Sequence, residues 1–293
     1  MTNETLDKAE AIKSIVRTAV ESYATGFQAR HEGEVDNPNG VINMKIHNVF
    51  IAALGEDIQY YSALVRSLDS SLGNMLEKMA INIAKLFYEV HKQVEGELYP
   101  EQTAKIAELL EAYKNTQNPL KPELKHYEEI RNIKPSDSSK VQTKAHVSDY
   151  YLIDKETNTH HLIELKIGGD LDNKKARSEK EAIFEQYAIL SNTLGKDAKI
   201  EAHFATAYNR FGENNEWNQG RVLQFFSKDE LLIGKDFWNF VCKSDDGYEL
   251  VLETYKECVE QFNYKKIDDK IPCYLNFNNI SYYLKNKFGL IYN

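Results

Sequence analysis

Two carboxylates and one lysine, Asp149, Glu164 and Lys166, have the residue types and the spacing of a magnesium site. Glu164 and Lys166 stand two apart in an apolar run, so in a strand both side chains point to the same face. Burying such a pair costs free energy unless each group finds a partner, and Asp149 would supply a second carboxylate from a neighbouring strand. Two carboxylates beside a lysine suit an oxygen-liganded Mg²⁺, which completes its shell with waters and substrate phosphate.

Hydrolysis of a phosphodiester is the chemistry that this set predicts. A Mg²⁺ held by Asp149 and Glu164 would polarise the phosphate and lower the pKa of a water. Lys166 would orient that water or help to deprotonate it, and would stabilise the developing negative charge. The alternative is a structural salt bridge between Glu164 and Lys166 at a sheet edge, because an Asp followed at a distance by Glu-x-Lys also occurs by chance.

The surrounding sequence predicts the order helix–strand–strand–helix–strand. Residues 146–154 and 160–168 are rich in β-branched, aromatic and aliphatic side chains and flank a polar turn, which indicates an antiparallel hairpin. A helix is expected at about 173–194, with Gly195 as its stop. The later elements expected are strands at 199–208 and 221–226, a capping box of Ser227 and Glu230, and helices at 236–241 and 248–262.

Helices predominate before the hairpin. Apolar residues recur at helical spacing, and Pro100 suits the first turn of a helix that ends near Ala112. The earlier helical segments expected are 12–27, 41–54, 58–68 and about 72–94. We therefore expect an α/β fold, with a mixed central sheet flanked by helices. Its parts would be a helical N-terminal region at 1–114 that contributes a helix to the core, an irregular connection at 115–144 (a DNA-facing loop or a solvated linker), and a catalytic α/β core at 145–293.

The composition predicts a globular protein of the reducing cytoplasm. Hydrophobic residues make up 42% and charged residues 28% of the chain, which is ordinary for such proteins, and no apolar run approaches the roughly 20 residues of a membrane span. Three cysteines without a close pair disfavour a disulfide framework or a zinc cluster. The net charge of −9 counts against phosphate binding, but residues 174–180 gather four basic side chains around one glutamate.

The motif resembles that of a known family. Ser148-Asp149 followed by Glu164-Leu165-Lys166 is similar to the PD-(D/E)xK motif of type II restriction endonucleases, with Ser148 where proline often stands. Residues 71–77 are similar to the helix that precedes the hairpin in these enzymes, where a glutamate points at the metal. The resemblance therefore implies Glu77 as a third metal ligand; the alternative is an exposed helix glutamate.

The resemblance extends over about residues 67–262. The segments 168–175, 185–187 and 234–238 are similar to the TdeIII-like group of these enzymes. That group implies a short palindromic recognition sequence of the GGNCC kind. The family also implies a companion DNA methyltransferase that protects the same sequence.

Two segments are candidates for contacts with double-stranded DNA. Lys174, Lys175 and Arg177 open the helix after the catalytic strand and could reach the backbone; the alternative is a solvated helix start. The Asn-rich segment 208–221 is a candidate recognition loop, because Arg reads guanine and Asn or Gln reads adenine in the major groove; the alternative is a surface loop of turn-forming residues. Its candidate residues are Asn209, Arg210, Asn214, Asn215, Gln219 and Arg221.

These observations together predict a Mg²⁺-dependent type II restriction endonuclease that cuts both strands of double-stranded DNA as a homodimer, because a palindrome presents two symmetric half-sites. One alternative is a repair or recombination nuclease of the same fold that recognises DNA structure. Another is a DNA-binding module with a vestigial metal site. His160 and His161 are expected to be exposed at a strand start rather than to bind a metal, and Cys242 and Cys258 to be core thiols.

Overall fold

The computed structural model describes residues 3–35, 37, 39–40, 44, 47–136 and 141–261 of the 293-residue chain. The chain divides into two compact units, one formed by Met1–Val16 with Gly73–Leu252 and the other by Arg17–Leu72 with Glu253–Asn293. The first unit contains the sheet and every predicted site residue. The predicted part boundaries at residues 114 and 144 stay a prediction.

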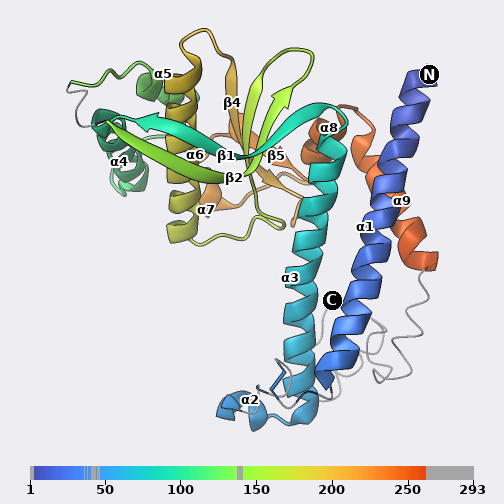
Figure 1. Ribbon diagram of the computed structural model, residues 1–293. Coiled ribbons are helices and arrows are strands. Elements are labelled where there is room, and N and C mark those ends of the chain that lie inside the picture. Colours follow the sequence, from blue (N-terminus) through green and yellow to red (C-terminus); the bar gives the residue numbers. More distant parts are fainter. Residues whose placement is uncertain are drawn as a thin grey trace. The chain divides into compact units, whose positions relative to one another are not determined.

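A mixed five-stranded sheet with the strand order β1-β2-β3-β4-β5 forms the centre of the first unit (Figure 1). Its strands are β1 (Tyr88–Leu98), β2 (Gln142–Asp154), β3 (His160–Leu165), β4 (Ile200–Thr206) and β5 (Leu231–Ile233). The pairs β1–β2 and β2–β3 are antiparallel, whereas β3–β4 and β4–β5 are parallel. The expected α/β fold with a mixed sheet and the expected antiparallel hairpin are therefore confirmed.

Helix α6 (Asn173–Leu194) makes the crossover that a parallel β3–β4 pair requires. The helix begins where the Asp172 side chain accepts a hydrogen bond from the Lys175 backbone N–H, and it ends at Gly195, whose φ of 88° suits glycine. Its bounds agree with the sequence prediction. Figure 1 shows α6 crossing the sheet.

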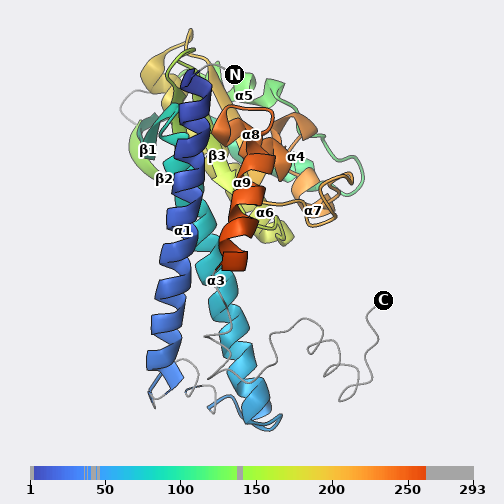
Figure 2. The same ribbon diagram turned by 90° about the vertical axis from the view of Figure 1, so that its right-hand side faces the viewer.

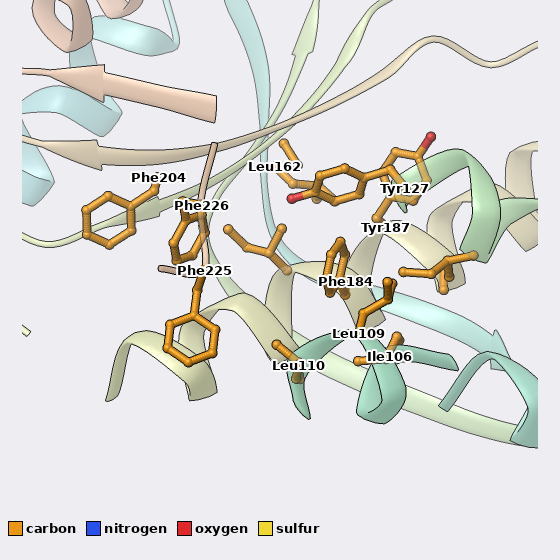
Figure 3. Packing of buried hydrophobic residues seen from close by; sticks show 14 of the residues in the cluster. Ile106, Leu109, Leu110, Tyr127, Leu162, Phe184, Tyr187, Phe204, Phe225 and Phe226 are labelled. Carbon is orange, nitrogen blue, oxygen red and sulfur yellow. The ribbon is translucent and has the colours of Figure 1, made fainter. Parts of the chain in front are cut away.

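One face of the sheet packs against α6, α4 (Pro100–Lys114) and α5 (Lys125–Arg131). Figure 3 shows the core between them, where Phe184 of α6 packs on Tyr127 of α5 and Phe204 of β4 packs on Phe226, with Leu162 of β3 in the same cluster. Leu162, Phe184 and Phe204 are completely buried, and each such side chain contributes about 1.5–3 kcal/mol. This core fixes the hairpin that carries the candidate catalytic residues.

The other face of the sheet carries α8 (Lys235–Cys242) and the part of α3 (Glu56–Ala84) from Gly73 onward (Figures 1 and 2). Tyr150 of β2 meets Phe237 of α8 edge-on with ring centroids 6.1 Å apart, and Tyr88 of β1 stacks on Phe240 at 5.4 Å. The remaining elements are α1 (Asn3–Val35), α2 (Val49–Ala52), α7 (Gly220–Leu223), the 3-10 helix η3 (Lys228–Glu230) and α9 (Gly247–Gln261).

Four secondary-structure predictions were wrong. The two helices expected at 58–68 and about 72–94 are one continuous helix, α3. The expected helix at 72–94 ends at Ala84, and Tyr88–Leu98 forms β1, because the polar and apolar residues there alternate and Tyr88, Val94 and Leu98 face the core. The expected strand at 221–226 is instead α7 and the turn after it, where Phe225 and Phe226 are both buried. The expected irregular connection contains α5 and the start of β2. The capping box of Ser227 and Glu230 and the helices α8 and α9 are confirmed.

The second unit has a small core of its own. Phe27 of α1 is buried there against Tyr23, Tyr61 and Leu68. The second half of α9 contributes Cys258, a buried free thiol as expected, and Cys242 of α8 is likewise a buried free thiol in the first unit. The third cysteine, Cys273, lies outside the described residues. Among the helices that the structure describes, none is long and apolar enough to cross a membrane.

Candidate active site

The register of the β2–β3 hairpin puts the two acidic residues of the motif at neighbouring positions on adjacent strands. Tyr150 pairs with Ile163, and the next residue along each strand is Asp149 on β2 and Glu164 on β3. Toward β1, the register shifts so that His91 pairs with Tyr151 and Gln93 with Val147. Asp149 therefore lies in a β-bulge, an irregularity that redirects side chains and is frequent beside active sites.

Glu164 and Lys166 form an ion pair on the face of the sheet that α6 covers. Glu164 is only 7% exposed, and the Lys166 Nζ lies 2.5 Å from its Oε1. The same Nζ lies 3.3 Å from Glu179 Oε1 on α6. The Lys166 backbone N–H donates to the carbonyl of Ala205, which fixes this residue beside β4. Lys166 is thus an ammonium between two carboxylates, an arrangement that compensates for the burial of Glu164.

The face of α3 that carries Glu77 packs against this end of the hairpin. The hydroxyl of Tyr150, the residue after Asp149, donates to the Glu77 carbonyl oxygen at 2.8 Å. One helical turn earlier, a Cβ at Gly73 would lie 3.5 Å from Ile167, the residue after Lys166. The half-buried Glu77 therefore lies on the helix face next to both strands of the motif. Carboxylate oxygens are the donors that Mg²⁺ prefers, and Glu77 and Glu164 carry such oxygens.

The basic start of α6 is less available to DNA than its sequence indicates. Lys174 and Lys175 are exposed. Arg177 is ion-paired with Glu111 at 3.2 Å and with Glu181 at 3.0 Å. Lys180 is 1% exposed and pairs inside the core with Glu230. Two of the four basic side chains in this segment therefore extend into solvent without such constraints.

The predicted recognition loop follows β4 and ends in α7, rather than joining two strands. Asn209 is buried and holds the loop together, since its side chain accepts from the Phe211 N–H and donates to the Asn215 carbonyl. Arg210 pairs with Asp170 at 2.6 Å, and Gln219 donates to the same carboxylate at 3.2 Å. The exposed candidates in the loop are Arg210, Asn214, Asn215 and Arg221.

Glycine joins this loop to the end of the catalytic strand. Gly169 has a φ of 63°, and a Cβ there would lie 2.8 Å from Thr206 and 3.0 Å from Trp217 of the loop. Such a conformation and such an approach favour glycine. Sequence reasoning did not assign this role, although the Gly168-Gly169 pair directly after Lys166 was its signal.

The two histidines at the start of β3 are buried, contrary to the expectation that they are exposed. His160 and His161 are each 6% exposed, because β2 and β4 flank β3 and the sheet is covered on both faces. His161 lies near Glu201 and His203 of β4, and these three residues could hold a metal ion. The signal in the sequence was the i, i+2 spacing of Glu201 and His203, which puts both on one face of a strand.

A mixed sheet whose elements follow one another in the chain as α3, β1, α4, α5, β2, β3, α6 and β4 is consistent with a nuclease fold of the restriction-endonuclease type. The family model of the type II restriction endonuclease HinfI matches residues 8–259. The chain therefore belongs to the HinfI family of type II restriction endonucleases and is a site-specific endodeoxyribonuclease that acts on DNA. Enzymes of this kind generally use a divalent metal ion. A search of curated proteins found no match.

Proposed function

We propose that this endonuclease hydrolyses both strands of double-stranded DNA at a short palindromic sequence and requires Mg²⁺. The observation that carries the proposal is the partly buried Glu164–Lys166 pair, next to the position of Asp149 on the adjacent strand. Asp149, Glu164 and Glu77 are the proposed metal ligands. The recognition sequence is left open, because GGNCC rested on the TdeIII-like group, and the matching family model is that of HinfI.

The proposed residues divide the chemistry between them. A Mg²⁺ ion bound to these carboxylates would supply positive charge to the phosphate and acidify a water. Lys166 is held 2.5 Å from Glu164, so its ammonium can donate to the attacking water or to a phosphate oxygen as negative charge develops. Glu179, the second carboxylate on Lys166, keeps that ammonium in place from α6. It acts as a positioning residue.

DNA binding is proposed for two exposed surfaces beside this site. Lys174 and Lys175 would contact phosphate at the start of α6, with Arg177 adding a contact if it leaves its glutamates. Bases would be read by the loop residues Arg210, Asn214, Asn215, Gln219 and Arg221. Asn209 instead shapes the loop from inside. The close packing of this loop on Gly169 would connect base reading to the catalytic strand.

A homodimer is proposed because two symmetric half-sites match a protein with twofold symmetry. Each protomer would cut one strand. We also propose a companion methyltransferase with the same sequence specificity as the genetic partner, and the cytoplasm as the place where both act.

Incubation of the purified protein with a long phage DNA tests the proposed activity. Discrete fragments in Mg²⁺ that are absent in EDTA and with the Asp149→Ala variant are the expected result, and mapping their ends gives the recognition sequence. A structure-selective nuclease would produce no such fragments from intact linear duplex. A binding module would retain duplex DNA in Ca²⁺ and cut none in Mg²⁺ or Mn²⁺.

A further inference from the structure

A second cluster of potential metal ligands lies on the opposite face of the sheet from Glu164. Its members are His161 of β3 and Glu201 and His203 of β4, whose ligand atoms all lie within 4.8 Å of one another. His161 and Glu164 are three residues apart in one strand, so their side chains project to opposite faces about 10 Å apart along it. The cluster is therefore separate from the candidate active site.

The parallel pairing of β3 and β4 assembles this cluster. His161 pairs with Glu201, and Ile163 pairs with His203, so all three side chains share one face of the sheet. Glu201 Oε2 lies 3.3 Å from His161 Nδ1 and 3.8 Å from His203 Nε2. The other oxygen, Oε1, pairs with the exposed Lys199. One carboxylate oxygen is thus directed at both imidazoles.

The cluster contains buried polar atoms that lack hydrogen-bond partners. His161 is only 6% exposed, and its Nδ1 has no hydrogen-bond partner; the same is true of both ring nitrogens of His203. An unsatisfied buried polar group destabilises a folded protein. A bound cation would satisfy the nitrogen atoms that face Glu201 and remove this penalty.

We propose that His161, Glu201 and His203 bind one divalent transition-metal ion of the zinc class. Two imidazoles and one carboxylate suit Zn²⁺ far better than Mg²⁺, which prefers an all-oxygen shell. In a tetrahedral site with ligands about 2.05 Å from Zn²⁺, neighbouring donor atoms lie about 3.3 Å apart. The distances of 3.3 and 3.8 Å already approach this value. A water completes the four ligands.

The surroundings hold the ligands in place. The Phe240 ring of α8 lies 5.0 Å from the His161 ring and 5.8 Å from the His203 ring, which restricts their rotation.

The ion would have a structural role. It would join the N-terminal halves of β3 and β4. This is the end of the sheet where β4 has no partner in β5, since β5 pairs only with residues 204–206 of β4. The α8 helix, which covers the cluster through Phe240, would be stabilised with it.

Calorimetric titration of the chelator-treated full chain with Zn²⁺ tests this site, in buffer with excess Mg²⁺ to occupy the proposed oxygen site. We expect one saturable Zn²⁺ site per chain, and a rise in melting temperature on its filling. Glu201→Gln and His203→Ala should each weaken binding at least ~10-fold. His47→Ala is the control, because His47 is an exposed histidine outside the cluster; it should bind Zn²⁺ like the unaltered chain.

Glu201 is about one-third exposed, and glutamine has the same size. Without metal, the melting temperature of Glu201→Gln should therefore match that of the unaltered chain. A Co²⁺ titration adds a spectroscopic test, since a four-coordinate Co²⁺ site absorbs strongly in the visible range. The proposal is overturned if the unaltered chain shows no saturable Zn²⁺ site, or if Glu201→Gln and His203→Ala bind Zn²⁺ as tightly as it does. Neither result would bear on DNA cleavage in Mg²⁺, which is measured separately.

Discussion

The ion pairs of Lys166 give the proposed catalytic role of this residue a direct test. Its ammonium is shared by Glu164 of its own strand and Glu179 of α6. Lys105 provides a natural comparison, because its ammonium also lies between two carboxylates, Glu108 at 3.1 Å and Glu129 at 3.2 Å, outside the candidate site. A difference between the two lysines therefore reports chemistry rather than the loss of an ion pair.

We expect Lys166→Met to lower the single-turnover rate of DNA cleavage by about 10²–10³-fold, because it removes a donor aimed at the developing charge. Lys105→Met should cleave at the rate of the unaltered enzyme. Duplex binding in Ca²⁺ should persist in both variants. Equal cleavage rates for the two variants would refute the role given to Lys166.

The hairpin that carries Asp149 and Glu164 was predicted correctly from the sequence, because alternating residues and turn-forming residues are local signals. The His161–Glu201–His203 cluster could not be predicted in the same way. It depends on the pairing of β3 with β4, which are separated by α6 in the chain. The burial of Lys180 was missed for the same reason: its partner Glu230 lies 50 residues further along.

At the scale of elements, the buried Lys180–Glu230 pair joins α6 to η3, and the Tyr127 hydroxyl of α5 donates to the same carboxylate at 2.6 Å. Lys180→Met would leave the fully buried Glu230 without its cation. We expect a loss of about 3–5 kcal/mol in the free energy of unfolding, measured by urea denaturation. The exposed-pair variant Lys105→Met should lose at most about 1 kcal/mol. Similar losses for both would show that Glu230 finds another partner.

A second contact between elements predicts a dependence on pH. Glu185 of α6 pairs with His146 at 2.8 Å and Lys144 at 3.0 Å, both on β2. The His146 contact is the main cause that lowers the pKa of Glu185, with Lys144 contributing. A carboxyl with a depressed folded-state pKa stabilises the fold above its unfolded pKa of about 4.3, and this contribution is lost as pH falls through the folded-state value.

Glu185→Gln should therefore be less stable than the unaltered chain at neutral pH, and the difference should shrink below about pH 4. Urea denaturation at a series of pH values measures this, with the exposed Glu108→Gln as the control. A difference that stays constant from pH 7 to pH 3 would contradict the assignment.

Helix α6 and strand β1 illustrate what can be read from sequence at this scale. Asp172 and Gly195 cap α6 at both ends, and its bounds were predicted correctly. Strand β1 was missed because Leu86 and Phe87 continue the apolar spacing of α3, whereas the antiparallel partner that makes Tyr88–Leu98 a strand lies on β2, more than 40 residues later. Where a helix ends because the next residues pair with a distant strand, the nearby sequence gives no signal for that end.

At the scale of the whole molecule, the chain is acidic, with a net charge of −9, and still belongs to a family that acts on DNA. Net charge does not give the distribution of charge, because exposed basic side chains such as Lys174 and Lys175 can line one surface of an acidic protein. The net charge therefore describes the phosphate-binding surface poorly. The fold class followed from the sequence, since helix–strand–strand–helix–strand order is a property of the chain as a whole.

The most direct test of the central claim is the rate of Mg²⁺-dependent cleavage by Glu164→Gln, measured in single turnover beside Glu108→Gln. Glutamine keeps the shape of Glu164 and its contact with Lys166 but removes the charge that would bind the metal. The predicted result is duplex binding in Ca²⁺ with a cleavage rate lowered by at least about 10²–10³-fold, while Glu108→Gln cuts normally. Cleavage by Glu164→Gln at the rate of the unaltered enzyme would contradict the site proposed for this endonuclease.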